Sequence, residues 1–129
     1  MADVATSIAG KRCLVLDDEF LIALDIQQIL EAAGAGSVTC VSNAADALAA
    51  LRNEPKFDFA VLDVKLSGAT RTSLSVAAVL AEQGTPFVFL TGMRSDDVHA
   101  MQFPTAQVVE KPYQAPLLMD AIFRALVGR

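Results

Sequence analysis

Five short apolar runs, separated by longer segments of helical composition, constrain the fold of this 129-residue chain more than any other feature. Most of these runs are continuously apolar, which is typical of parallel strands buried on both faces. A strand and a helix that alternate five times predict a doubly wound α/β fold, with helices on both faces of one parallel sheet. The runs lie at residues 13–16, 38–41, 59–62, 87–90 and 107–109.

The segments between the runs carry helix signals. Ser42 or Asn43 can cap a helix that Pro55 prevents from continuing much beyond residue 53. Gly34 and Gly84 are expected to end two others. Helices are predicted over residues 19–33, 43–53, 73–83 and 115–127, with at most a brief helix at 95–102.

Composition limits the class of protein. The length suits one domain, and we expect an N-terminal tail at residues 1–10 and one domain over 11–129. The longest uncharged stretch, 32–45, contains Gly, Ser and Thr, whereas a membrane span needs about 20 mostly apolar residues. A net charge of −5 disfavours nucleic-acid binding, and the first ten residues lack a signal peptide. We therefore expect a cytoplasmic protein with no nucleic-acid or membrane partner.

The two cysteines, Cys13 and Cys40, both lie in apolar runs. We expect two small buried side chains in a reducing compartment, rather than a disulfide or a metal site.

Polar residues follow the apolar runs at the points where chemistry collects in an open parallel sheet, the carboxyl ends of the strands. Asp17 and Asp18 follow the first run and Asp63 follows the third. If the strand order is 2-1-3-4-5, these three carboxylates converge on one pocket, where they repel each other unless a cation neutralises them. Oxygen ligands at an open edge suit Mg²⁺, which keeps several of its waters.

Two further side chains complete a possible phosphoryl site. Asp63 can attack phosphorus and hold the group as an acyl phosphate, while the Thr91 hydroxyl and the Lys111 ammonium can bind its other oxygens. Each residue alone is weak support, because a cap, a turn or an exposed lysine explains it equally well. The four positions in this order are hard to obtain by chance.

This pattern resembles the receiver domain of bacterial two-component response regulators, from about residue 11 to the end of the chain. The resemblance implies a flavodoxin-like fold with strand order 2-1-3-4-5 and a Mg²⁺ cofactor. It also implies that Asp63 is the phospho-accepting residue, with Asp18 a direct Mg²⁺ ligand and Asp17 a ligand through water. The backbone carbonyl of Lys65 would complete the metal site.

The same resemblance assigns two more roles. Thr91 corresponds to the switch hydroxyl, and Lys111 to the lysine that contacts the phosphoryl group. The bond between Lys111 and Pro112 is usually cis in the family.

Residues 86–92 are similar to a subgroup whose fourth strand reads Pro-Phe-x-Phe-Ala-Thr-Gly. Val108 stands where most receivers carry the Tyr or Phe that follows the switch threonine inward, and Met93 replaces a frequent aromatic. Ser67 replaces a common proline. Our hypothesis is that segment 92–104 reorders on phosphorylation in place of a ring flip.

The chain ends directly after the last expected helix, which predicts a stand-alone receiver that is not an enzyme and acts through protein contact. Its partner would be a histidine kinase or a histidine phosphotransferase, with a downstream target possible. His99, the single histidine, suits a surface residue rather than a phosphodonor. Met101, Phe103 and Tyr113 suit an exposed patch or the core equally well.

Two alternatives stay open. A pseudo-receiver would bind partners without phosphorylation, although Asp18, Asp63 and Lys111 are all present. An aspartate-nucleophile phosphatase of the haloacid dehalogenase type needs a second acid two residues after its nucleophile, where this chain has Lys65.

Overall fold

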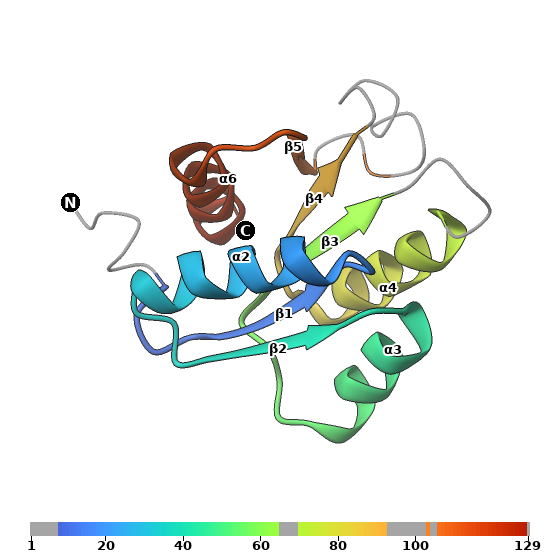
Figure 1. Ribbon diagram of the computed structural model, residues 1–129. Helices are drawn as coiled ribbons and strands as arrows, with labels where there is room; N and C mark the ends of the chain where they lie inside the picture. Colours follow the sequence, from blue (N-terminus) through green and yellow to red (C-terminus); the bar gives the residue numbers. More distant parts are fainter. Residues whose placement is uncertain (1–7, 65–69, 93–102, 104–105, 129) are drawn as a thin grey trace.

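A five-stranded parallel sheet is the centre of the fold (Figure 1). The computed structural model describes residues 8–64, 70–92, 103 and 106–128, apart from the side chains of 70–72. The strand order is β2-β1-β3-β4-β5, so the expected doubly wound sheet is confirmed. The strands are β1 (Arg12–Leu16), β2 (Ser37–Val41), β3 (Phe59–Val64), β4 (Phe87–Thr91) and β5 (Gln107–Glu110). The helices are α2 (Phe20–Ala32), α3 (Ala44–Asn53), α4 (Thr70–Gln83) and α6 (Ala115–Val127).

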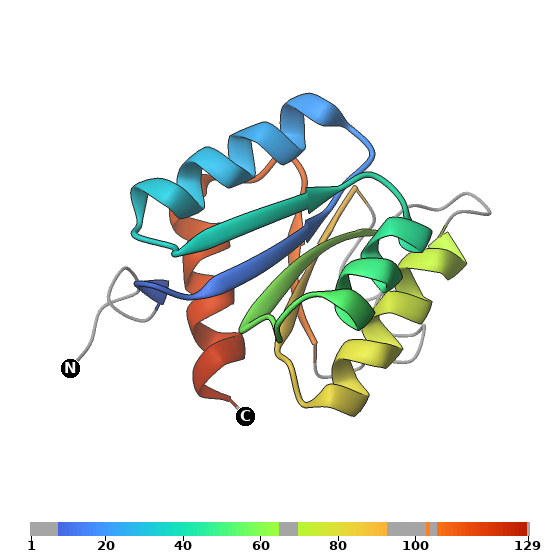
Figure 2. The same cartoon turned by 90° about the horizontal axis from the view of Figure 1, so that it is seen from below.

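Helices cover both faces of the sheet and bury two separate halves of the core (Figure 2). Because side chains alternate along a strand, Cys13 and Val15 of β1 face one way and Leu14 and Leu16 the other. The first pair packs with α2 and α6, and the second with α3 and α4. The central strands are buried on both sides, which explains why their sequences are continuously apolar.

The helix boundaries follow from local chemistry. The Asn43 side chain accepts a hydrogen bond from the backbone N–H of Asp46 and caps α3, as the sequence predicts. Gly34 follows α2 with a φ of +100°, a left-handed conformation that only glycine adopts without strain. The Ala35 N–H then reaches back to the Leu30 carbonyl at 3.0 Å, so the chain leaves the helix abruptly.

The expected burial of Cys40 is wrong. Cys13 on β1 is buried, but Cys40 on β2 is exposed, and both thiols are free. β2 is one of the two edge strands and has one strand neighbour, so its side chains are only partly covered. The apolar run over residues 38–41 therefore signals a strand without signalling full burial.

The packed core begins upstream of Lys11. Ile8 has no exposed surface and belongs to the core that faces α2 and α6. The Gly10 N–H donates to the Gly34 carbonyl at 2.8 Å, and a Cβ on Gly36 would lie 2.5 Å from the Gly10 carbonyl oxygen. This close backbone contact ties the start of the described chain to the loop before β2.

Of the residues that suit either a patch or the core, Phe103 packs against the core beside α3 and α4, edge-on to Phe87 and Phe89. Tyr113 packs against the core beside α2 and α6. Met101 and His99 lie outside the described residues. The most exposed large apolar side chains of the described chain are Phe20 and Leu21, at the start of α2, with 75% and 76% of their surface exposed.

Among the described residues, no helix combines the length and the apolar character that crossing a membrane requires.

Replacing Ile8 by alanine tests whether the segment before Lys11 belongs to the folded unit. We expect Ile8→Ala to lower the free energy of unfolding by about 2–4 kcal/mol, because it leaves a cavity in the core. Urea denaturation measures the change. Leu117→Ala, at a side chain 59% exposed, is the control and should change stability by no more than about 0.5 kcal/mol. Equal, small effects of both substitutions would contradict the packing of Ile8.

Candidate functional site

The alternation of side chains directs three predicted site residues toward the α2 side of the sheet. Asp17 continues the row of Val15 on β1, and Asp63 continues the row of Val61 on β3. Lys111 follows Val109 of β5, and its backbone N–H donates to the Thr91 carbonyl at 2.7 Å. Because β1 and β3 are neighbours, the acidic ends of these strands meet at the carboxyl edge of the sheet.

The three predicted acids form one cluster. Carboxylate oxygens of Asp17, Asp18 and Asp63 all lie within 4.8 Å of one another. Asp17 and Asp63 are buried, with 3% and 5% of their surface exposed, whereas Asp18 is exposed. Asp17 Oδ2 is buried and has no hydrogen-bond partner. Oxygen donors at this spacing, one of them buried without a hydrogen bond, fit a small hard cation such as Mg²⁺.

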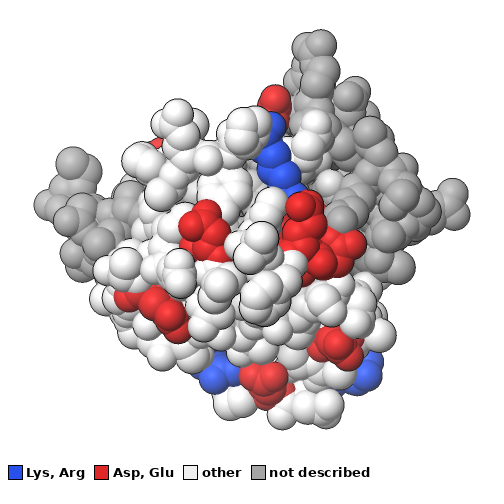
Figure 3. Space-filling view, in the orientation of Figure 1, with Lys and Arg blue, Asp and Glu red and all other residues white. Residues whose placement is uncertain are grey.

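The Lys111 ammonium bridges the cluster. Its Nζ donates to Asp63 Oδ1 at 3.0 Å and to Glu19 Oε1 at 3.3 Å, and lies 3.6 Å from Asp17 Oδ2. Figure 3 shows acidic side chains gathered beside a basic side chain on this face of the molecule. The peptide bond between Lys111 and Pro112 is cis, as the resemblance implies.

The electrostatics of the cluster follow from burial and charge. Burial raises the pKa of Asp17, and the Asp63 carboxylate raises it further, although the Glu19 backbone N–H opposes both. Burial alone would lower the pKa of Lys111, but the hydrogen bond to Asp63 and the charge of Asp17 outweigh it, so this pKa is raised. Lys111 therefore remains an ammonium ion at neutral pH.

Two hydroxyl groups donate hydrogen bonds to the backbone around Asp63. Thr91 is fully buried at the end of β4, and its Oγ1 donates to the Val64 carbonyl at 3.1 Å. Ser73 of α4 donates to the backbone carbonyl of Asp63 at 2.6 Å. Nothing in the sequence marks Ser73 as a site residue, because only the packing of α4 against β3 brings it there. The contact between Glu19 and Lys111 is likewise not predicted by the sequence, in which Glu19 simply follows an acidic pair.

Some predicted positions cannot be compared. Lys65, Ser67 and Met93 lie outside the described residues, as does nearly all of segment 92–104. Val108 is described, and it pairs in register with Phe89 and packs against the core beside α3 and α4.

Known proteins match this sequence and fold. In this parallel α/β sheet, a buried aspartate at the end of β3, an acidic pair after β1 and a lysine after β5 lie at one end of the strands. The sequence matches the response regulator receiver domain over residues 13–123, and the chain belongs to that family. Receivers of this family are signalling modules of two-component systems and interact with histidine kinases or phosphotransfer proteins.

Solved structures agree with the assignment. A response regulator receiver protein from Sinorhizobium medicae is 26% identical, with a TM-score of 0.77 over 92% of this chain and 95% of its own. A CheY-like receiver domain from Methanospirillum hungatei is 28% identical, with a TM-score of 0.76 over 92% and 94%. TrrA from Thermotoga maritima, solved with Mg²⁺ and BeF, shares the fold at 24% identity and a TM-score of 0.75, over 90% of this chain and 99% of its own. No curated protein matches the sequence.

Substituting Asp17 by asparagine should have opposite effects with and without Mg²⁺. Because the pKa of Asp17 is raised, its ionisation opposes folding, and the stability it contributes is lost as pH rises through the folded pKa. At pH 7 with a chelator, Asp17→Asn should therefore unfold at higher urea than the wild type. At a free Mg²⁺ concentration of 100 times Kd, the wild type should gain about 2.7 kcal/mol and Asp17→Asn much less.

Asp120→Asn is the matched control for this experiment, because Asp120 pairs with Arg124 on the surface of α6. It should show the same Mg²⁺ gain as the wild type. An equal Mg²⁺ gain in Asp17→Asn would remove Asp17 from the metal site.

Proposed function

We propose that this receiver accepts a phosphoryl group on Asp63 from a partner's phosphohistidine, and then signals by protein contact or passes the group on. The observation that carries the proposal is the buried Asp63 carboxylate between an ammonium ion 3.0 Å away and two further acids. Packing does not explain this carboxylate, because the fold does not require three acids at the carboxyl ends of neighbouring strands.

The residues of the chain divide the chemistry. A carboxylate oxygen of Asp63 attacks phosphorus, a P–O bond forms, and the P–N bond of the donor breaks. The electron pair of that bond returns to the imidazole, which keeps the proton on its other nitrogen. Lys111 binds the incoming phosphoryl oxygens and Thr91 supplies a hydroxyl donor. Asp17, Asp18 and Asp63, with the Lys65 backbone carbonyl, would hold Mg²⁺, which when bound neutralises negative charge on the phosphoryl oxygens.

The group is later lost or passed on. When water attacks the phosphorus, the P–O bond to Asp63 breaks, inorganic phosphate leaves, and the carboxylate is restored. In this proposal the chain catalyses only its own phosphorylation and dephosphorylation and is not otherwise an enzyme. We also place the protein in the cytoplasm. Residues 86–92 support its membership of the subgroup with the Pro-Phe-x-Phe-Ala-Thr-Gly fourth strand.

We further propose that the partner that supplies the phosphoryl group lies against the start of α2. Phe20 and Leu21 are 75% and 76% exposed, and they directly follow Glu19, whose carboxylate contacts Lys111. An exposed apolar pair that directly follows a residue in contact with Lys111 suits the surface of the protein that presents the phosphohistidine.

The two alternatives fit the site less well. A pseudo-receiver does not need a buried acceptor aspartate held by Lys111. A phosphatase of the haloacid dehalogenase type would need an acid at position 65, where the chain has lysine.

The decisive experiment is the intact mass of the protein after incubation with acetyl phosphate and Mg²⁺. We expect a gain of one phosphoryl group, which disappears in Asp63→Asn and in the presence of a chelator. Asp58→Asn, at a residue on the opposite edge of the sheet that binds the Arg12 backbone, is the matched control and should still gain the group. No gain in wild-type protein that binds Mg²⁺ would favour the pseudo-receiver.

The partner surface can be separated from the chemistry with a charged substitution on α2. Leu21→Asp should slow phosphotransfer from a phosphorylated histidine protein by about tenfold or more, because it puts a charge into an apolar contact. Phosphorylation of this variant by acetyl phosphate should match the wild type. Leu117→Asp, the same substitution at an exposed leucine on α6, should affect neither rate. Equal transfer rates in all three proteins would exclude this face of α2 as the docking surface.

A further inference from the structure

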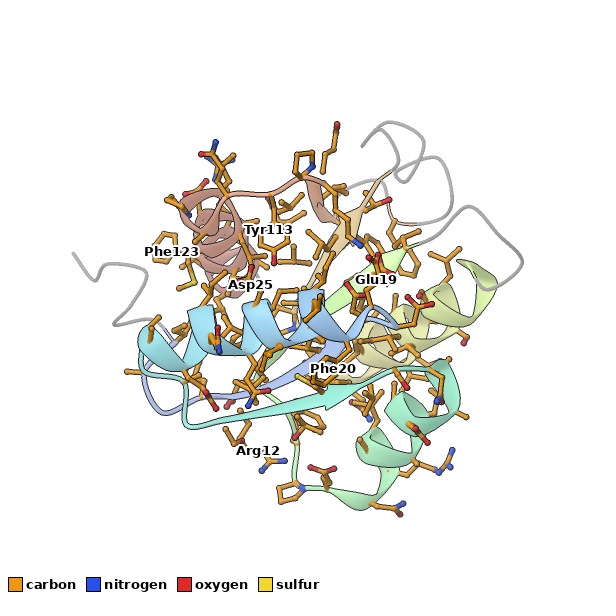
Figure 4. The ribbon with its side chains drawn as sticks, in the orientation of Figure 1. Arg12, Glu19, Phe20, Asp25, Tyr113 and Phe123 are labelled. Atoms are coloured by element: carbon orange, nitrogen blue, oxygen red, sulfur yellow. The ribbon has the colours of Figure 1, made fainter. Side chains whose placement is uncertain are left out.

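The short loop between β5 and α6 is attached to α2 by two side-chain hydrogen bonds. Lys111 Nζ donates to Glu19 Oε1 at 3.3 Å, and Tyr113 Oη donates to Asp25 Oδ2 at 2.5 Å. Figure 4 shows Tyr113 directed toward Asp25 across the space between α6 and α2. The first bond belongs to the site already described, whereas the second has no assigned role.

The Tyr113 side chain is well placed to control the loop. Its ring packs against the core beside α2 and α6, so the side chain is half-buried and its position is fixed at one end. At the other end, the phenol is bound by a carboxylate, a charge-assisted hydrogen bond of the stronger kind. Tyr113 therefore joins the loop to a rigid helix at a point two residues from Lys111.

Within the part of the chain that the structure describes, the backbone hydrogen bonds of this loop lie at its two ends. The Lys111 N–H donates to the Thr91 carbonyl, and the Gln114 carbonyl accepts from the N–H groups of Leu117 and Leu118. Pro112 has no backbone N–H to contribute. The Tyr113–Asp25 bond consequently supplies a side-chain attachment in the middle of the loop that carries the ammonium ion.

We propose that Asp25 and Tyr113 are positioning residues, and that the hydrogen bond between them holds the loop so that Lys111 meets the phosphoryl group on Asp63. This inference rests on the proposed function of Asp63. Neither residue touches the acceptor, and both act through Lys111. Without the bond, the loop samples more conformations and Lys111 loses part of its binding geometry.

The protonation of the phenol supports the attachment. Partial burial raises the pKa of Tyr113, and the hydrogen bond and the charge of Asp25 raise it further. The phenol therefore stays protonated, and stays a hydrogen-bond donor, throughout the neutral pH range.

The test compares Tyr113→Phe, Asp25→Ala and the double variant in binding beryllofluoride at saturating Mg²⁺, followed by ¹⁹F NMR. Each single variant should bind about fivefold more weakly, the effect of one net hydrogen bond. The double variant should bind no more weakly than the singles, because both remove the same bond. Mg²⁺ affinity without beryllofluoride should be unchanged in all three variants, because the acidic cluster is intact. A general loss of structure would instead weaken the binding of both Mg²⁺ and beryllofluoride.

Asp120→Asn, which removes one negative charge from α6, is the control and should bind beryllofluoride like the wild type. Wild-type affinity in both single variants would overturn the positioning role and leave the proposed function standing. Additive losses in the double variant would also overturn it. If the wild type binds Mg²⁺ but no beryllofluoride, the proposed function fails, and the positioning role fails with it.

The bond itself can be observed separately, because Tyr113 is the single tyrosine of a chain without tryptophan. Ultraviolet titration of the phenol should give a lower pKa in Asp25→Ala than in the wild type. Identical titrations would mean that the bond does not form in solution.

Discussion

The mutual repulsion of buried carboxylates is the constraint on which the rest of this structure depends. Asp17 and Asp63 are buried within a few ångströms of each other, and the charge of Lys111 offsets part of that repulsion. The fold maintains the arrangement by placing the acids at the ends of two neighbouring central strands, whose apolar residues are buried on both faces. The stability of the core therefore supports a cluster of acids that is electrostatically unfavourable and that a bound cation would stabilise.

The sequence predicts the layout of this site well, because strand topology converts positions far apart in the chain into neighbours. Asp17, Asp63 and Lys111 each follow an apolar run, and a parallel sheet brings the carboxyl ends of its strands to one edge. The order of the strands came from the resemblance to receivers and not from the apolar pattern. Without that order, the runs predict a doubly wound sheet but not which strands are neighbours.

Features that depend on how the strands and helices are arranged in space could not be predicted from the sequence. The predicted burial of Cys40 is wrong because an apolar run does not distinguish an edge strand from a central one. Ser73 reaches the Asp63 backbone only through the packing of α4, and Tyr113 meets Asp25 only because α2 lies beside the loop after β5. These contacts join residues whose separate positions in the sequence carry no signal for one another.

The alternation of side chains along the strands also places the site residues in rows that face opposite sides of the sheet. Asp63 and Lys111 extend the rows that face α2 and α6, whereas Thr91 extends the row of Phe89, which faces α3 and α4 together with Val108 and Phe103. A group bound at Asp63 would thus meet Lys111 from one face of the sheet and Thr91 from the row of the other face. The site therefore lies where the two halves of the core meet, and Thr91 stands at the end of the row that includes Phe89, which packs edge-on to Phe103.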